Sequence, residues 1–189
     1  MKRILLEMPM IMPNELGGNL RILLNDLSEK SFEVTIQEFN ENGRLIDEPG
    51  SLIAVKLKDN EKGCPDGTYE IIHSDAVSGY GPLMYDIAIE WSSVVGEGIM
   101  SDRQSVSSDA QNVWMKYFND RSDVIKIPLP TSCADPVAGT FRYGSPVPSS
   151  WSIHRYKKES MPVISQLNSL DKIKIKVDFK DFDLNNLRR

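Results

Sequence analysis

The stretch Ser78-Gly79-Tyr80-Gly81-Pro82 decides the fold, together with the segments on either side of it. Residues 68–73 before it have strand character, and the apolar residues of 83–95 after it recur at helical spacing. The turn therefore lies at the start of a helix, where backbone N–H groups lack partners within the helix. We expect this turn to hold a phosphate or pyrophosphate by main chain alone, since its two glycines allow close approach.

Length and composition set the class of protein. With 189 residues, 40% apolar and 26% charged, the chain predicts one globular domain with loops and an extension. A net charge of −5 argues against a general binder of nucleic acid or of anionic membranes, because such proteins carry a basic excess. No apolar run approaches the roughly 18 residues of a membrane span. The apolar stretch that follows Met1-Lys2-Arg3 is too short for a signal peptide. The expected location is the cytoplasm.

The cysteines suggest no metal centre. Cys64 and Cys133 have no ligand-like spacing with His73 or His154, so we expect no metal site. We interpret them as two free thiols in a reducing compartment.

The chain before the turn predicts an antiparallel meander. Residues 3–8 read as a strand, and Leu16, Leu20, Leu23, Leu24 and Leu27 at helical spacing predict a short amphipathic helix. Residues 32–39 alternate apolar and polar side chains, as a half-buried strand does, and Asn42-Gly43 follows as a hairpin turn. Further strands are predicted at 51–58 and 68–73.

After the turn, helices alternate with short strands. The helix 83–95 places Asp86, Glu90 and Ser93 off its apolar stripe and ends at Gly96 and Gly98. A short strand is predicted at 99–100 and a helix from Ser108 to about residue 121, capped by Ser108, Ser107 or Ser105. Strands are predicted at 124–129, 151–157 and 172–177. A proline-rich loop, 130–150, lies between the first two.

This order resembles the GNAT superfamily, the GCN5-related N-acetyltransferases. The run Gly79-Tyr80-Gly81-Pro82-Leu83-Met84-Tyr85-Asp86-Ile87-Ala88 and the later Met100-Ser101-Asp102-Arg103 look like acetyltransferase-like proteins of bacteriophages, over about residues 69–129. The resemblance implies an α+β fold: a central, mostly antiparallel mixed sheet flanked by helices. Residues 1–158 would form the GNAT-like domain, and 159–189 a C-terminal extension of strand and helix.

The resemblance also implies a cofactor site. In that family the pyrophosphate of acetyl-coenzyme A lies on the turn, and the pantetheine arm pairs with the splayed end of the preceding strand. The corresponding cradle here is Val77, Ser78, Gly79, Tyr80, Gly81, Pro82 and Leu83. The alternative is that the glycines only shape a turn. Arg103 could contact a phosphate or an acidic substrate; the alternatives are a pair with Asp102 or a cap for the next helix.

Two positions depart from the family pattern. Ala76 stands where an Arg or Gln usually begins the turn, which removes one anchoring side chain. Trp114 stands where the family has the Tyr that protonates the leaving thiolate, and an indole cannot do so. Tyr117, one helical turn later on the same face, is the candidate acid; the alternative, which the pattern favours, is that Trp114 and Tyr117 both pack in the core.

Glu70 and His73 are the candidate general bases on the strand before the turn. Either could accept a proton from the attacking amine through water. On an ideal strand they point to opposite faces, so only one can face a cleft. The family analogy favours Glu70, while the structural alternative is a solvated carboxylate.

Two functions follow from this reading. The first is an N-acetyltransferase that uses acetyl-coenzyme A and a small-molecule or protein amine, in a host cytoplasm if the chain is phage-encoded. The second is a non-catalytic protein of the same fold that binds a host or virion protein. The second function is favoured by Ala76, by Trp114, and by the 130–150 loop with the C-terminal extension.

Overall fold

The computed structural model describes residues 18–28, 30–58, 63–102, 106–134 and 150–177. The strand predicted at 3–8 lies outside these residues, as do most of the predicted loop 130–150 and the end of the predicted extension.

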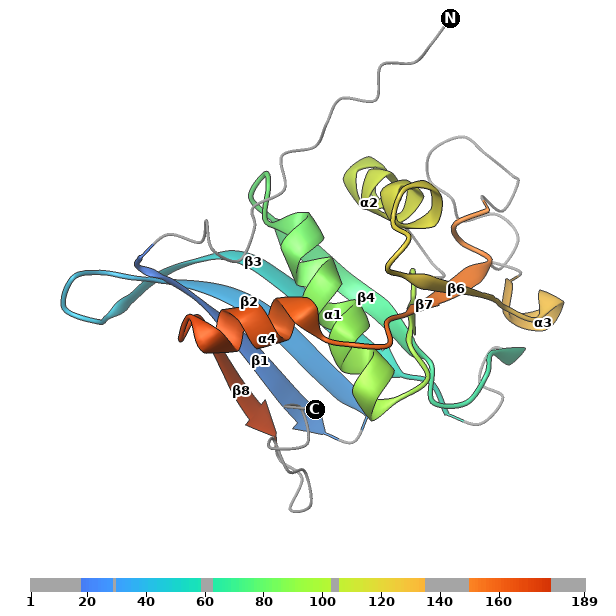
Figure 1. Ribbon diagram of the computed structural model, residues 1–189, viewed down its shortest axis with the longest axis horizontal. Coiled ribbons are helices and arrows are strands. Elements are labelled where there is room, and N and C mark those ends of the chain that lie inside the picture. The colour runs from blue at the N-terminus through green and yellow to red at the C-terminus, as the bar shows by residue number, and fades with distance from the viewer. Residues whose placement is uncertain (1–17, 29, 59–62, 103–105, 135–149, 178–189) are drawn as a thin grey trace, which may run out of the picture.

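A mixed sheet organises the described chain, with eight strands in the order β6-β7-β5-β4-β3-β2-β1-β8 (Figure 1). Most neighbouring strands are antiparallel, whereas β4 with β5 and β1 with β8 are parallel. The strands are β1 Leu20–Ser28, β2 Ser31–Phe39, β3 Leu45–Lys56, β4 Tyr69–Ala76, β5 Ile99–Met100, β6 Ile125–Pro128, β7 His154–Lys157 and β8 Ile173–Val177. The helices described are α1 Gly81–Val95, α2 Ser108–Asn119, α3 Thr131–Ala134 and α4 Pro162–Ser169.

The expected α+β class with a mixed, mostly antiparallel sheet is confirmed. The meander β1 to β4 is antiparallel throughout, and α1 follows β4 through the glycine turn as predicted. The segment that we treated as an extension supplies α4 and β8, and β8 adds to the sheet beside β1.

The amphipathic helix predicted at 16–27 is wrong, because residues 20–28 form strand β1. Leu20, Ile22 and Leu24 are buried, which is the period-two pattern of a strand with one face on the core. A leucine-rich run satisfies both periods. Pairing with β2 on one side and β8 on the other selects the strand over the helical preference of leucine.

The core lies between one face of the sheet and the helices α1 and α4, which lie side by side across that face (Figure 1). Phe32, Val34 and Ile36 of β2 contribute to it from the sheet, and Trp91 and Leu167 contribute from the two helices. α1 is buried over nearly its whole circumference, from Pro82 to Ser92. It is therefore the central helix of the fold, and its first turn and its flanks determine the polar sites described below.

The cysteines form a disulfide, so the expectation of two free thiols is wrong. Cys64 and Cys133 are separated by 69 residues, and only the folded chain brings the loop before β4 against α3. Both are buried in a small apolar cluster with Leu57, Met100 and Leu129. Disulfides persist in oxidising environments, so the cysteines no longer support a reducing compartment.

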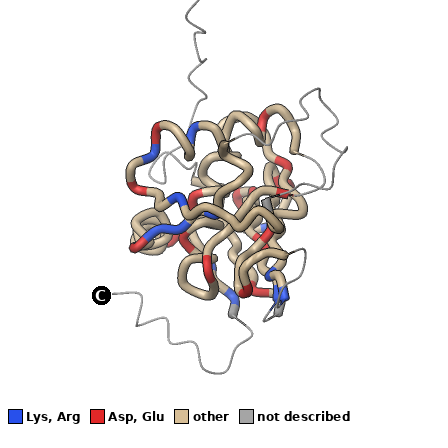
Figure 2. Tube along the Cα trace, turned by 90° about the vertical axis from the view of Figure 1, so that its right-hand side faces the viewer, with Lys and Arg blue, Asp and Glu red and all other residues tan. Residues whose placement is uncertain are grey.

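Charge is spread rather than gathered. Figure 2 shows acidic and basic positions interspersed along the described chain. Within the described residues, no helix is long and apolar enough to cross a lipid bilayer.

Candidate functional site

The edge of β4 that faces β5 is largely open. The parallel pair covers only Tyr69 with Ile99 and Glu70 with Met100, whereas β4 continues along β3 to Ala76. In the described part of the chain, residues 71–76 have no strand partner on that side. Their main-chain groups can therefore pair with an extended ligand that carries amides, as a peptide does when it adds to a sheet edge.

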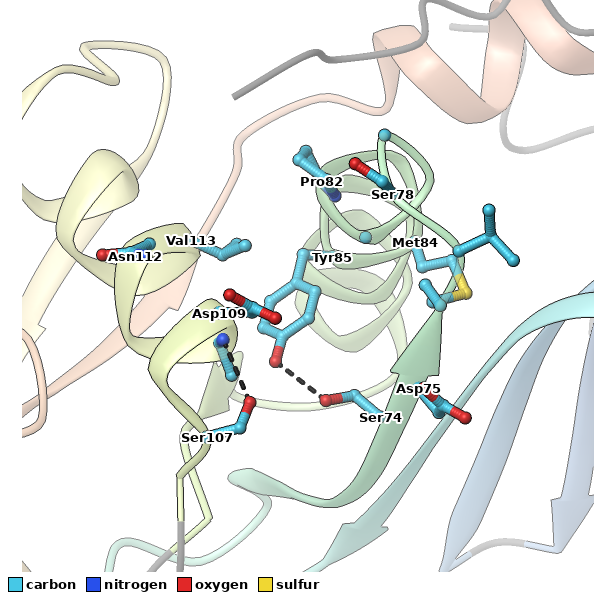
Figure 3. Close-up of a pocket in the computed structure, with 15 residues that line it drawn as sticks. Ser74, Asp75, Ser78, Pro82, Met84, Tyr85, Ser107, Asp109, Asn112 and Val113 are labelled. Atoms are coloured by element: carbon cyan, nitrogen blue, oxygen red, sulfur yellow. Dashed lines mark hydrogen bonds between the residues drawn. The ribbon is translucent and has the colours of Figure 1, made fainter. Parts of the chain in front are cut away.

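Two adjoining cavities follow this edge. One, of about 350 Å³, lies at the start of α1, and the other, of about 210 Å³, lies between β4 and the start of α2. Ser74, Tyr85, Ser107 and Ala110 line both cavities, so we treat the two as one site, the β4–α2 cleft. Figure 3 shows the larger part, with α2 on one side and α1 and β4 on the other. Its volume falls within the roughly 300–1,000 Å³ typical of ligand pockets.

The first turn of α1 opens into this cleft without a cap. Tyr80 is the N-cap residue and makes no side-chain capping bond, and the first turn holds no acidic residue. Gly79 has φ of +96°, a conformation that residues with a Cβ rarely adopt. A Cβ on Gly81 would meet no atom within 4 Å. Pro82 has no N–H, so the first turn offers the N–H groups of Gly81 and Leu83, together with the positive end of the helix dipole.

Most of the predicted cradle lies in the cleft. Val77, Ser78, Gly79, Gly81 and Pro82 line the larger cavity. The other cradle residues, Tyr80 and Leu83, are not among its lining residues; Leu83 is buried in the core, and Tyr80 packs against it.

Charge in the cleft is acidic. Asp75 and Asp109 line the larger cavity, and Asp102 lines the smaller one, as His73 does. Among the described lining residues there is no Lys or Arg, and Arg103 lies outside the described residues. An anion in the larger cavity would thus be held by main-chain N–H groups against the repulsion of two carboxylates.

The predicted acid Tyr117 is enclosed by protein. Its hydroxyl donates to the carbonyl oxygen of Pro82 at 3.0 Å, and its side chain is buried. Burial, and after it the charge of Asp86, raises the pKa of Tyr117 well above its ordinary value. Tyr117 is not among the described residues that line the cleft. It ties α2 to the first turn of α1, and its catalytic role stays a prediction.

The predicted base Glu70 is buried on β4 and is likewise not among the lining residues, whereas the alternative, His73, is exposed and lines the smaller cavity. Our expectation that the two point to opposite faces is wrong. Ile53 pairs with His73 and the next residue, Ala54, pairs with Ile71, so Ile72 is an extra residue in a bulge. The bulge turns Glu70 and His73 to the same face.

Sequence reasoning missed Tyr85 and Ser74. Tyr85 Oη lies 3.1 Å from Ser74 Oγ, and both residues line both cavities (Figure 3). Tyr85 stands one helical turn after Gly81, so its place beside the predicted cradle was the available signal. The side of α1 that it occupies, however, depends on how the helix packs.

On the cleft's other wall, Ser107 is the N-cap of α2, the alternative to Ser108 that the sequence left open. Its hydroxyl accepts from the N–H of Ala110 at 3.2 Å.

A second group of polar side chains lies on the middle of α1. Lys158 Nζ donates to Asp86 at 2.7 Å and to Glu90 at 3.0 Å, and all of these residues are buried. Arg121 makes a bidentate contact with Asp86, at 2.9 and 3.1 Å. Asp86 and Glu90 were expected off the apolar stripe, and they are; they face these cations instead of solvent.

Glu90 also caps α4. Its carboxylate accepts from the N–H of Val163 at 3.1 Å and of Ile164 at 2.9 Å, in the first turn of α4. Burial raises the pKa of Glu90, against the charge of Lys158 and these N–H groups. Burial alone would lower the pKa of Lys158, but Asp86 and Glu90 outweigh it and raise that pKa. We call Asp86, Glu90, Arg121 and Lys158 the α1 charge cluster; its members satisfy one another.

Searches against protein-family models, curated proteins and solved structures found no match to this chain.

Proposed function

We propose that the chain binds acetyl-coenzyme A in the β4–α2 cleft and transfers the acetyl group to an amine, as a GNAT-type acyltransferase. The observation that carries this proposal is the open edge of β4, which runs directly to the uncapped first turn of α1. The family resemblance implies both halves of that arrangement: a splayed strand end for the pantetheine arm, and a glycine turn for the pyrophosphate. The parallel β4–β5 pair with α1 between its strands further supports it.

The residues present fit such a ligand through main chain. N–H groups of the first turn of α1 would hold the pyrophosphate, and the edge 71–76 of β4 would pair with the amides of the arm. Acetyl-coenzyme A supplies the acetyl group as a thioester, which is activated for attack by an amine. The chain contributes proximity, and N–H groups of the β4 edge polarise the carbonyl.

The acidic lining makes the ligand pose testable. Asp109 and Asp75 would repel the phosphates, so removal of one charge should strengthen binding. We expect Asp109→Asn to bind acetyl-coenzyme A more tightly than the wild type, and Asp47→Asn, which removes a carboxylate from the exposed β2–β3 hairpin, to bind as the wild type does. Added salt should narrow the difference between Asp109→Asn and the wild type, because it screens the repulsion.

Isothermal titration calorimetry with acetyl-coenzyme A tests the proposal directly. Binding in the micromolar range is expected, with its loss in Gly81→Trp, where the indole would fill the open space beside the first turn. Absence of binding at millimolar ligand would sink the proposal.

A thiol-release assay across an amine panel then tests turnover. The panel includes small polyamines and peptides with a free N-terminus or lysine. Tyr117→Phe and Glu70→Gln are compared with the wild type. If neither variant changes the measured rate, the two catalytic predictions made from the sequence are wrong, even where binding is intact.

A second candidate is a non-catalytic protein that binds a host or virion protein. It is favoured by Trp114, a buried core residue packed on Tyr85 and Tyr156 at the family's tyrosine position. It is also favoured by the β2–β3 hairpin, where Leu45 and Ile46 are 42% and 56% exposed. This candidate predicts no heat of binding with acetyl-coenzyme A, so the same titration separates the two functions.

A further inference from the structure

Tyr85 places a phenol hydroxyl at the junction of the two cavities. The side chain leaves the second turn of α1 toward β4, and its hydroxyl meets Ser74 at the open edge of that strand (Figure 3). Because Tyr85 lines both parts of the cleft, a ligand that runs from the first turn of α1 along the β4 edge passes this hydroxyl.

The packing around Tyr85 fixes that position. Its ring meets Trp114 edge to face, with centroids 5.2 Å apart, and only 3% of the residue is exposed. A buried ring held in this way loses little further freedom when a ligand binds. Trp114, which cannot act as an acid, thus orients a side chain that can.

Two of the other buried phenols, Tyr117 and Tyr156, have partners of another kind. The hydroxyls of Tyr117 and Tyr156 donate to backbone carbonyls, of Pro82 and Trp151. A carbonyl only accepts, whereas the Ser74 hydroxyl both donates and accepts. Burial raises the pKa of Tyr85 above its ordinary value; the bond to Ser74 acts against this and the charge of Asp102 adds to it. The phenol therefore keeps its proton at neutral pH. Once that proton has been given away, the Ser74 hydroxyl can supply another.

We propose that Tyr85 is the general acid of acyl transfer, in place of a residue on α2; this rests on the proposed function. The amine nitrogen forms a bond to the acetyl carbon as the carbon–sulfur bond breaks. Tyr85 gives its proton to the leaving sulfur, which yields the free thiol of coenzyme A. The nitrogen loses one proton to solvent, and the phenolate regains one from solvent through Ser74. The products are the acetylated amine and the thiol.

The experiment compares wild type, Tyr85→Phe and Tyr156→Phe, the last a matched control that removes a buried phenol hydroxyl outside the cleft. Calorimetry with acetyl-coenzyme A should find similar affinities for all three proteins. Single-turnover transfer should slow by about a hundredfold in Tyr85→Phe alone. Ultraviolet absorbance of the bound thiolate of coenzyme A gives a readout without turnover. Loss of the phenol donor should raise the pKa of the bound thiol by about one to two units.

The outcomes separate the two proposals. If the wild type binds no acetyl-coenzyme A, the proposed function fails. If it binds and Tyr85→Phe leaves both the transfer rate and the thiol pKa at wild-type values, Tyr85 is not the acid and the proposed function stands. Should Tyr85→Phe lose its fold by circular dichroism, Ser74→Ala replaces it. That variant keeps the phenol and should slow transfer by about tenfold, and a wild-type rate would overturn the proposal.

Discussion

The first turn of α1 leaves polar groups open to the β4–α2 cleft, whereas the middle of the same helix pairs its polar groups inside the protein. At the first turn, N–H groups face the β4–α2 cleft with no side-chain cap and with a glycine backbone around them. In the middle, Asp86, Glu90 and Lys158 of the α1 charge cluster are buried, Arg121 is partly buried, and each of these charges has a partner. Buried charges that are all paired with one another have a structural role. A ligand can bind instead where accessible polar groups have no protein partner. The titratable cluster is therefore not our candidate site, although it holds more charge.

The largest effect should come from breaking the cluster. Lys158→Met leaves Asp86 and Glu90 buried without their shared cation, which should lower the free energy of unfolding by about 3–5 kcal/mol in urea denaturation. The matched control is Lys157→Met. Its partner Glu97 is exposed, so it should cost at most about 1 kcal/mol. Equal losses in the two variants would show that the cluster is no more structural than a surface pair.

Glu90→Gln tests the link from the cluster to α4. The amide keeps one acceptor oxygen where the carboxylate offers two, so at least one N–H of the first turn of α4 loses its partner. We expect a loss of about 1–3 kcal/mol. Hydrogen exchange should accelerate at Val163 and Ile164 before it does in β2. Uniform acceleration across the chain would contradict the capping role, and Glu159→Gln, at an exposed position, serves as the control.

A smaller effect is expected from Asp123, which binds Arg121 at 2.6 Å at the surface of the cluster. The hydrogen bond from Arg121 holds the pKa of Asp123 at about 2, below its ordinary 3.8. Its contribution is therefore present above pH 3.8 and is lost as the pH falls toward 2. Asp123→Asn should flatten this part of the stability profile, by less than about 1 kcal/mol because half of the carboxylate is exposed. An identical acid limb in both proteins would contradict this assignment.

The smallest change in stability is expected from Gly81→Ala. This variant also distinguishes the first turn of α1 most clearly from the charge cluster in its middle. The added methyl group meets open space, and the unfolded chain loses freedom, so the fold should gain about 0.4–1 kcal/mol. Acetyl-coenzyme A should bind more weakly, because the methyl group lies where the ligand must approach the main chain. Calorimetry and thermal unfolding together check the opposite signs. A gain in both affinity and stability would argue against a ligand at the first turn.

Sequence patterns predicted the elements whose structure is determined by residues close to one another in the chain. The strand at 32–39, the glycine turn and the helices α1 and α2 were predictable because their periodicity and end signals lie within a few residues. The helix prediction failed at residues 20–28 because a leucine-rich run fits both the helical and the strand period. Pairing with the neighbouring strands of the sheet decides between the two. α4 has its cap supplied by Glu90, more than 70 residues earlier, so nothing local marks where it begins.

The candidate site was predictable only in part for the same reason. The cradle residues 77–83 follow from the turn itself, and five of them line the larger cavity. The faces of Glu70 and His73 depend on a bulge that strand periodicity does not contain. The burial of Tyr117 away from the cleft and the position of Tyr85 in the lining of the cleft depend on how α1 packs between β4 and α2.

The disulfide has a consequence for the cleft as a unit. Every described residue that lines it lies between Ile71 and Trp114, and therefore within the covalent loop that Cys64 and Cys133 close. A single protease cut anywhere in that loop would leave the two fragments joined, and they would separate on a gel only after reduction. The elements that form the cleft are thus held together twice, once by the backbone and once across the loop.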